Sequence, residues 1–180
     1  GQYVGPLLAE GYAVLGLDHF GPRGIERAAD VAGVFNPVTA ISDALLALKI
    51  AAANSKIDAK RIGIMGLSMG GITAEGTAFE FVRQRVLGAA DVRFAAHVSF
   101  YGPCQTVYMN GAATLTRAPG LLLKGDKDET TARAKCEAMT AAIKAAQANA
   151  PIETIWYPGA YHAWDVTAFP AARYFPNHVN

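Results

Sequence analysis

Short apolar runs alternate with longer helical patterns along most of this 180-residue chain. This alternation is typical of βα units, which place their strands in a parallel sheet and pack helices on its faces. No internal repeat, low-complexity tract or interdomain linker interrupts the pattern. The sequence therefore predicts one α/β domain over residues 1–180, built as a three-layer sandwich around a mostly parallel sheet.

Apolar runs bounded by glycine, proline or polar residues predict the strands. They are residues 12–17, 61–67, 94–101, 120–124 and 152–157. We expect residues 12–17 to form a buried strand, preceded by a short helix over 3–10 that Gly11 ends in a left-handed conformation.

Helical spacing of apolar residues predicts three longer helices between the strands. They begin at Asn36–Pro37, at Met69 and at Thr131, and we expect them to end near residues 52, 85 and 148. The first has the clearest start, because asparagine caps a helix and proline suits its first turn.

Composition excludes several classes of protein. The hydrophobic fraction of 52% and charged fraction of 17% are typical of a folded, soluble chain. A net charge of +1 without any basic run argues against a nucleic-acid partner. No apolar segment approaches the roughly 18 residues of a membrane span. The start of the chain lacks a signal-peptide pattern and does not identify the compartment. We expect a soluble protein of bacterial type, cytoplasmic or periplasmic, and the sequence leaves the choice open.

Cysteine and ligand spacing argue against a metal or nucleotide cofactor. Cys104 and Cys136 are too far apart for a zinc ligand pair. Two buried free thiols are the simpler interpretation, and a single bridge, which would indicate an oxidising compartment, is the alternative. No histidine and carboxylate cluster has ligand spacing, and no G-x-G-x-x-G motif follows a strand.

The pentapeptide Gly66-Leu67-Ser68-Met69-Gly70 lies between a predicted strand and a predicted helix. In this context G-x-S-x-G forms a sharp turn that strains the serine backbone and presents the hydroxyl above the sheet. We expect both Gly66 and Gly70 to be glycine because a side chain there would collide with neighbouring backbone. The helix start adds a partial positive charge beside Ser68. The alternative is a tight turn without a catalytic role.

A serine nucleophile needs a base, usually a histidine that a carboxylate orients. His162 is the candidate, because its loop follows the last strand and reaches the carboxyl edge of the sheet, where Ser68 also points. His97 lies in an apolar strand and is expected to be a hydrogen-bonded core residue. His178 is near the end of the chain, and His19 follows a strand tip, where it could line a pocket or cap a loop.

Two carboxylates at the end of the 120–124 strand, Asp126 and Asp128, compete for the third position. Both precede the His162 loop in the chain. The order serine, aspartate, histidine is the order in α/β-hydrolases.

These motifs together resemble the dienelactone hydrolase branch of the α/β-hydrolases. The resemblance covers most of the chain and rests on the segments 11–18, 20–24, 61–71, 100–104, 125–128 and 157–162. In the family pattern the triad aspartate is the fourth residue of G-x-x-D, which selects Asp128. The namesake enzymes use a cysteine nucleophile, whereas this chain has Ser68 and is similar to the serine-using esterase relatives.

The resemblance implies a serine hydrolase that cleaves carboxylic esters of small acyl or aryl substrates. Ser68 would form an acyl-enzyme, His162 would move its proton and Asp128 would orient His162. The N–H of Met69 would be one oxyanion donor. The alternatives are a binding module that kept the triad without turnover, and an acyltransferase that uses an acceptor other than water.

Compared with the family, the chain resembles a version shortened at both ends, without an early strand and its donor loop and without a closing helix. The 12–17 strand could move beside the 61–67 strand, so that His19 or Phe20 offers the second oxyanion donor. Alternatively, a homodimer could cover the open sheet edge.

Aromatic residues and His19 are the candidate walls of an apolar pocket for short acyl or aryl esters. They are His19, Phe20, Tyr101, Trp156 and Trp164. For each aromatic ring, packing in the core is the alternative interpretation.

Overall fold

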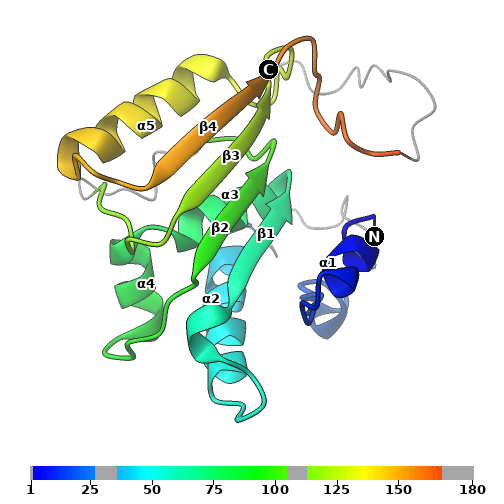
Figure 1. Cartoon of the computed structure of the whole chain (residues 1–180), viewed down its shortest axis with the longest axis vertical. Helices are drawn as coiled ribbons and strands as arrows, with labels where there is room; N and C mark the ends of the chain where they lie inside the picture. Colours follow the sequence, from blue (N-terminus) through cyan, green and yellow to red (C-terminus); the bar gives the residue numbers. More distant parts are fainter. Residues whose placement is uncertain (1, 27–35, 105–112, 168–180) are drawn as a thin grey trace.

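A four-stranded parallel sheet forms the centre of the molecule. The computed structural model describes residues 2–26, 36–104 and 113–167. The strands are β1 (Gly63–Leu67), β2 (Ala96–Phe100), β3 (Gly120–Gly125) and β4 (Ile152–Tyr157). They lie in the order β1-β2-β3-β4, so neighbours in the chain are neighbours in the sheet (Figure 1). All four carboxyl ends therefore meet at one edge.

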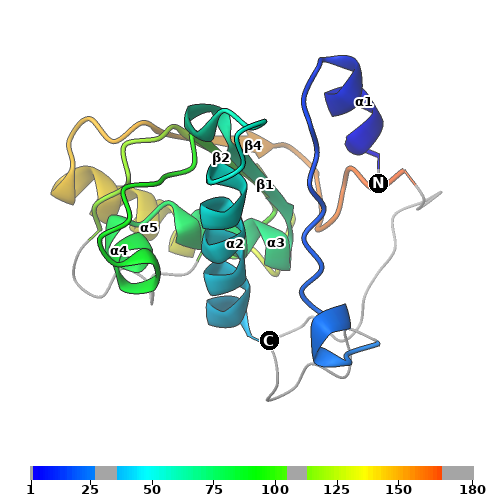
Figure 2. The same cartoon turned by 90° about the horizontal axis from the view of Figure 1, so that it is seen from below.

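Four helices cover one face of this sheet (Figures 1 and 2). They are α2 (Pro37–Ala52), α3 (Met69–Thr77), α4 (Glu80–Leu87) and α5 (Arg133–Ala146). The predicted start of α2 is confirmed, because the Asn36 side chain accepts a hydrogen bond from Thr39 N at 3.1 Å. Short 3₁₀ segments lie at Gly21–Arg23 and Ala59–Arg61.

The two faces of the sheet differ in burial. His97, Ser99 and Leu122 point toward the helices and are at most 3% exposed. On the other face Met65 and Ile155 are each 37% exposed. Helix α1 (Val4–Ala9) lies to one side, and the Tyr3 ring just before it packs 5.0 Å from the Phe100 ring. The predicted α/β class with a parallel sheet is confirmed in a reduced form.

The predicted strand over residues 12–17 is wrong. This segment contains no strand, and its side chains are exposed, with Leu15 at 72% and Tyr12 at 58%. An apolar run becomes a strand only where a neighbouring strand accepts its hydrogen bonds, and this segment does not pair with β1. The alternative that placed it beside β1 is therefore wrong too, while the homodimer stays a prediction. The predicted left-handed Gly11 is confirmed, with φ of 82°.

The helix predicted from Met69 to about residue 85 is two helices. Phe79 interrupts it with an extended backbone and forms an antiparallel bridge with Leu115. Residues on both sides of Phe79 are hydrogen-bonded to the segment 114–116. Thr116 N donates to Ala78 O at 2.8 Å, and Glu80 N donates to Thr114 O at 3.0 Å. These bonds replace the helical ones, and the Phe79 ring is buried in the core.

The expectation of two free thiols is also wrong, because Cys104 and Cys136 form a disulfide. Their Cα atoms are 5.0 Å apart, and both residues are buried in the core cluster between α5 and the sheet. The bond joins the segment after β2 to the first turn of α5.

The turn from β1 into α3 depends on two glycines. Ser68 has a φ of 52°, a strained value for a residue with a side chain. A Cβ at Gly66 would lie 1.9 Å from Gly70 O, and one at Gly71 would lie 2.8 Å from Gly102 Cα. A Cβ at Gly70 would meet nothing within 4 Å, so the collision expected there is wrong and Gly71 is the second restricted position.

We expect Gly66→Ala to lower the free energy of unfolding by at least about 2 kcal/mol, because the new methyl group overlaps backbone that cannot move aside. Gly70→Ala is the matched control and should leave stability unchanged or raise it by up to about 1 kcal/mol, since alanine favours a helix. Urea unfolding of the two variants measures both. Equal effects would contradict the geometry of this turn.

We expect removal of the disulfide to destabilise the fold by about 3–4 kcal/mol, because the bond closes a loop with a sequence separation of 32. The Cys104→Ser/Cys136→Ser variant should unfold at lower urea concentration than the oxidised protein. Dithiothreitol should lower the midpoint of the wild type and leave that of the variant unchanged. A wild type that is insensitive to reduction would contradict the prediction.

Candidate active site

Three side chains from separate parts of the chain meet at the carboxyl edge of the sheet. Ser68 follows β1, Asp128 follows β3 and His162 follows β4. The distance from Ser68 Oγ to His162 Nε2 is 2.9 Å, and that from His162 Nδ1 to Asp128 Oδ2 is also 2.9 Å. The side chains form one continuous hydrogen-bonded relay. A hydroxyl, an imidazole and a carboxylate in this arrangement can activate the hydroxyl as a nucleophile.

Asp128 is held in a tight turn that leaves one oxygen for His162. Its Oδ1 accepts hydrogen bonds from Thr130 N at 2.9 Å, Thr130 Oγ1 at 2.7 Å and Thr131 N at 3.2 Å. Burial of the carboxyl group acts to raise its pKa, but the hydrogen bonds from His162 and Thr130 outweigh burial and lower the pKa. Asp128 is therefore ionised at neutral pH and can stabilise a charged imidazolium.

Asp126, the competing carboxylate, has a different role in the structure. Its Oδ1 accepts a hydrogen bond from Gly159 N at 2.7 Å and so fixes the turn after β4. Of the two aspartates, Asp128 is the one bonded to His162. The structure places Asp126 at the base of the loop that carries His162.

Sequence reasoning missed Thr130. Its Oγ1 lies 2.7 Å from His162 Nδ1 and donates to Asp128 Oδ1, so the hydroxyl bridges the two. A protonated Nδ1 can donate to both oxygens, which fixes the tautomer and leaves Nε2 as the acceptor for Ser68. The available signal was the Asp128-Glu129-Thr130 spacing, since an aspartate often bonds to the backbone two residues on.

Two of the other histidines are engaged elsewhere. His97 is buried, and its Nδ1 lies 3.1 Å from Ala74 O and 3.2 Å from Thr77 Oγ1. Burial lowers the pKa of His97 to about 4, so it is neutral, as expected of a core histidine. His19 Nδ1 lies 2.9 Å from Asp43 Oδ2, and the Arg23 guanidinium binds the same carboxylate. His178 lies outside the described residues.

The predicted pocket residues divide into two groups. Tyr101 is buried with a φ of 39°, and its ring makes an edge contact with the His162 ring at 4.9 Å. Trp164 lies 6.3 Å from the Tyr101 ring, in the His162 loop. Trp156 instead packs against the core, with the Arg133 guanidinium 4.7 Å from its ring.

The turn with His19 and Phe20 lies beside the start of α3, because the side chains of Phe20 and Met69 pack against the same cluster, Ile25 and Ala40. The N–H of Phe20 donates to Asp18 Oδ1 at 2.9 Å. Met69 is the first residue of α3, and the N–H of a first helical residue has no partner within its helix.

Within residues 2–26, 36–104 and 113–167, no group of histidine, cysteine, aspartate and glutamate side chains could hold a metal ion. The same residues contain no helix with the length and apolar character needed to cross a membrane.

Comparison with solved structures places the fold among α/β-hydrolases. A dienelactone hydrolase-like promiscuous phosphotriesterase from metagenomic libraries matches with a TM-score of 0.68 and 18% identity, over 90% of this chain and 64% of that one. A provisionally assigned dienelactone hydrolase from Klebsiella pneumoniae matches with a TM-score of 0.60 and 24% identity, over 84% and 62%. The chain thus spans less than two thirds of the length of either relative.

A thermophilic esterase from Thermogutta terrifontis also matches, with a TM-score of 0.51 and 17% identity, over 72% of this chain and 56% of that one. A search of curated proteins finds no match. The sequence pattern of the dienelactone hydrolase family, however, matches residues 5–173, which is nearly the whole chain. The chain belongs to the dienelactone hydrolase family.

Proposed function

We propose that this chain is a serine hydrolase that cleaves carboxylic esters of small acyl or aryl substrates through an acyl-enzyme on Ser68. The observation that carries the proposal is the relay from Ser68 Oγ through His162 to Asp128, with both hydrogen bonds at 2.9 Å. The family assignment supports hydrolysis as the class of reaction.

The relay supports a two-step acyl transfer. His162 Nε2 removes the proton from Ser68 Oγ while the oxygen attacks the ester carbonyl, and Asp128 stabilises the imidazolium that forms. His162 then gives the proton to the leaving alkoxide. Water attacks the acyl-enzyme with His162 again as base, which releases the acid and restores Ser68. An acyltransferase would differ only in the group that attacks the acyl-enzyme.

Charge develops on the carbonyl oxygen and needs N–H donors, each worth roughly 3 kcal/mol in comparable sites. The N–H of Met69 is one donor, because it starts α3 directly after the nucleophile. Phe20 is the proposed second donor: residues 12–17 do not pair with β1, but the Phe20 side chain still packs with that of Met69 against Ile25 and Ala40. Asp18 accepts the N–H groups of Phe20 and Gly21, so this role requires the Phe20 N–H to leave Asp18 when substrate binds.

The surroundings of His162 support a substrate with an apolar acyl or aryl group. Tyr101 and Trp164 place aromatic rings beside the relay, and aromatic walls favour apolar groups. Solved relatives with this fold are described as an esterase and as a promiscuous phosphotriesterase, and both names denote cleavage of an ester bond. The hydrogen-bonded relay and the strained backbone of Ser68 favour an enzyme over a binding module, because a binding module needs neither of these two features.

Ser68 is expected to react with a fluorophosphonate and to turn over p-nitrophenyl acetate. Ser68→Ala should abolish both, and His162→Ala should lower kcat by several powers of ten, because the hydroxyl then lacks its base. Mass spectrometry of the labelled peptide and a spectrophotometric assay measure these outcomes. Folded wild-type protein that neither labels nor turns over would rule out the proposed function and favour the binding module.

Thr130→Val should lower kcat about tenfold with little change in KM, because His162 loses one of the two oxygens that fix its tautomer. Thr130→Ser is the matched control, since it keeps the hydroxyl, and should retain most of the rate. Steady-state kinetics on the p-nitrophenyl ester test the pair. Equal rates for the valine and serine variants would show that the Thr130 hydroxyl does not contribute to the reaction.

A further inference from the structure

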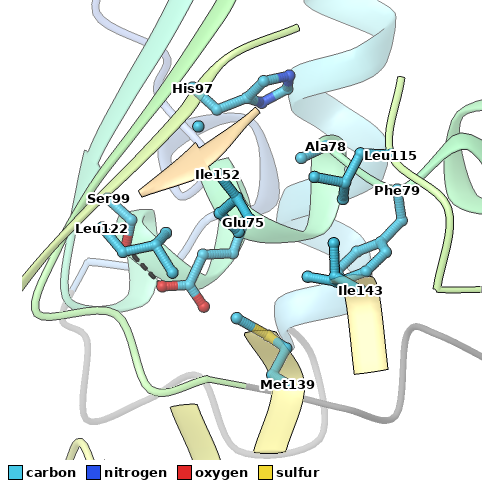
Figure 3. A pocket seen from close by; sticks show the side chains of 11 residues that line it. Glu75, Ala78, Phe79, His97, Ser99, Leu115, Leu122, Met139, Ile143 and Ile152 are labelled. Atoms are coloured by element: carbon cyan, nitrogen blue, oxygen red, sulfur yellow. Dashed lines mark hydrogen bonds between the residues drawn. The ribbon is translucent and has the colours of Figure 1, made fainter. Parts of the chain in front are cut away.

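A buried ion pair lies beneath the site. Lys124 Nζ on β3 is 2.5 Å from Glu75 Oε1 on α3, and the two side chains are 0% and 4% exposed. Ser99 Oγ on β2 also donates to Glu75 Oε1, at 2.7 Å (Figure 3). The relay from Ser68 to Asp128 uses none of these three residues.

Core stability alone does not account for this pair. Charged groups lose their hydration when buried, and a buried ion pair is often no more stabilising than apolar residues of the same size. Desolvation raises the pKa of Glu75, and the Lys124 charge only partly opposes this rise. Glu75 Oε2 is buried without a hydrogen-bond partner among the described residues. It borders a cavity also lined by Leu122 and Met139 (Figure 3).

A second contact of Lys124 connects this ion pair to the site. Its ammonium group also donates to Gly102 O, in the segment Phe100–Gly102 at the end of β2. This segment touches both halves of the site: Phe100 O accepts the N–H of Ser68 at 3.0 Å, and Tyr101 O accepts Thr131 Oγ1 at 3.2 Å. Thr131 belongs to the turn that holds Asp128.

The same segment also meets the serine helix by backbone contact. A Cβ on Gly102 would lie 2.6 Å from Gly71 C, so no side chain fits between α3 and the segment. A shift of Gly102 by a fraction of an ångström would therefore displace Gly71, which is three residues after Ser68. Lys124 is the charged group that fixes the carbonyl of Gly102.

We propose that Lys124 is a positioning residue for the proposed reaction, with Glu75 as its buried counter-ion. The ammonium group holds the Phe100–Gly102 segment against both the serine turn and the Asp128 turn, and so keeps Ser68 Oγ within reach of His162 Nε2. The inference rests on the proposed function. A positioning role requires a loss in kcat, since misplacement of a catalytic group by about 1 Å can cost up to 10²-fold in rate.

The test compares two variants that disturb the same pair in different ways. Lys124→Met/Glu75→Gln removes the Gly102 anchor and leaves no unpaired charge in the core. Ser99→Ala removes another hydrogen bond of Glu75 and keeps the anchor. We expect the double variant to lose at least about tenfold in kcat and in the rate of fluorophosphonate labelling, with KM changed less than threefold. Ser99→Ala should retain at least about half of the wild-type kcat.

A folded double variant with wild-type kcat would overturn the inference, as would an equal loss in Ser99→Ala. If the double variant does not fold, Lys124→Gln/Glu75→Gln decides, because glutamine is polar and uncharged but one bond shorter than lysine, so it fills the position without the contact to Gly102 O. A folded Gln variant with lowered kcat and unchanged KM supports the positioning role, and one with unchanged kcat overturns it.

A second readout separates this inference from the proposed function. Crystal structures of the wild type and of the double variant report the distance from Ser68 Oγ to His162 Nε2 directly, with or without turnover. The inference requires this distance to lengthen in the double variant and to stay near 2.9 Å in Ser99→Ala. Wild-type protein without labelling at Ser68 would refute the proposed function alone, while an unchanged distance in the double variant would refute the inference alone.

Discussion

The contact between the backbones of Gly71 and Gly102 is the constraint on which the rest of the site depends. It brings the first turn of α3 against the end of β2 with no side chain between them. Because α3 packs this closely against β2, its first residues lie at the carboxyl edge of the sheet. The loops that follow β3 and β4 begin at the same edge. Any larger residue at either position would separate Ser68 from the loops that carry Asp128 and His162.

Local features of the sequence were sufficient for the main elements. The runs that became β1 to β4 are apolar and bounded by turn residues, and the capping pair Asn36–Pro37 marked the start of α2. The order of the strand ends also placed Ser68, Asp128 and His162 at one edge, because parallel strands share an edge regardless of their distance in the sequence. Each of these predictions depended on short segments of chain.

The errors and omissions concern contacts between segments. Residues 12–17 have the composition of a strand and lack a neighbouring strand to pair with. The break at Phe79 depends on Leu115, and the disulfide depends on how α5 packs near Cys104. Lys124 ends an apolar run, and nothing near it in the sequence indicates that its charge is buried. Its buried partner, Glu75, lies 49 residues earlier in the chain.

Ser68 and Tyr101, two strained residues that follow strands, show how the sheet itself specifies the site. Ser68 and Tyr101 both have positive φ, and each directly follows a strand. Ser68 N donates to Phe100 O at the end of β2, and Tyr101 N donates to Leu123 O on β3. The same pattern continues when Asp126 N donates to Tyr157 O at the end of β4.

Each turn is therefore held by the next strand in the sheet. Strain of this kind costs roughly 1–3 kcal/mol per residue and persists only where surrounding contacts over-determine the backbone. Since the strand order follows the chain order, the contacts that hold Ser68 in place come from residues later in the sequence. The pentapeptide around Ser68 permits the turn, and the register of β2 and β3 fixes it. A shift of either strand by one residue would turn the side chains of that strand to the opposite faces of the sheet, and it would move these acceptors away from the turns that they hold.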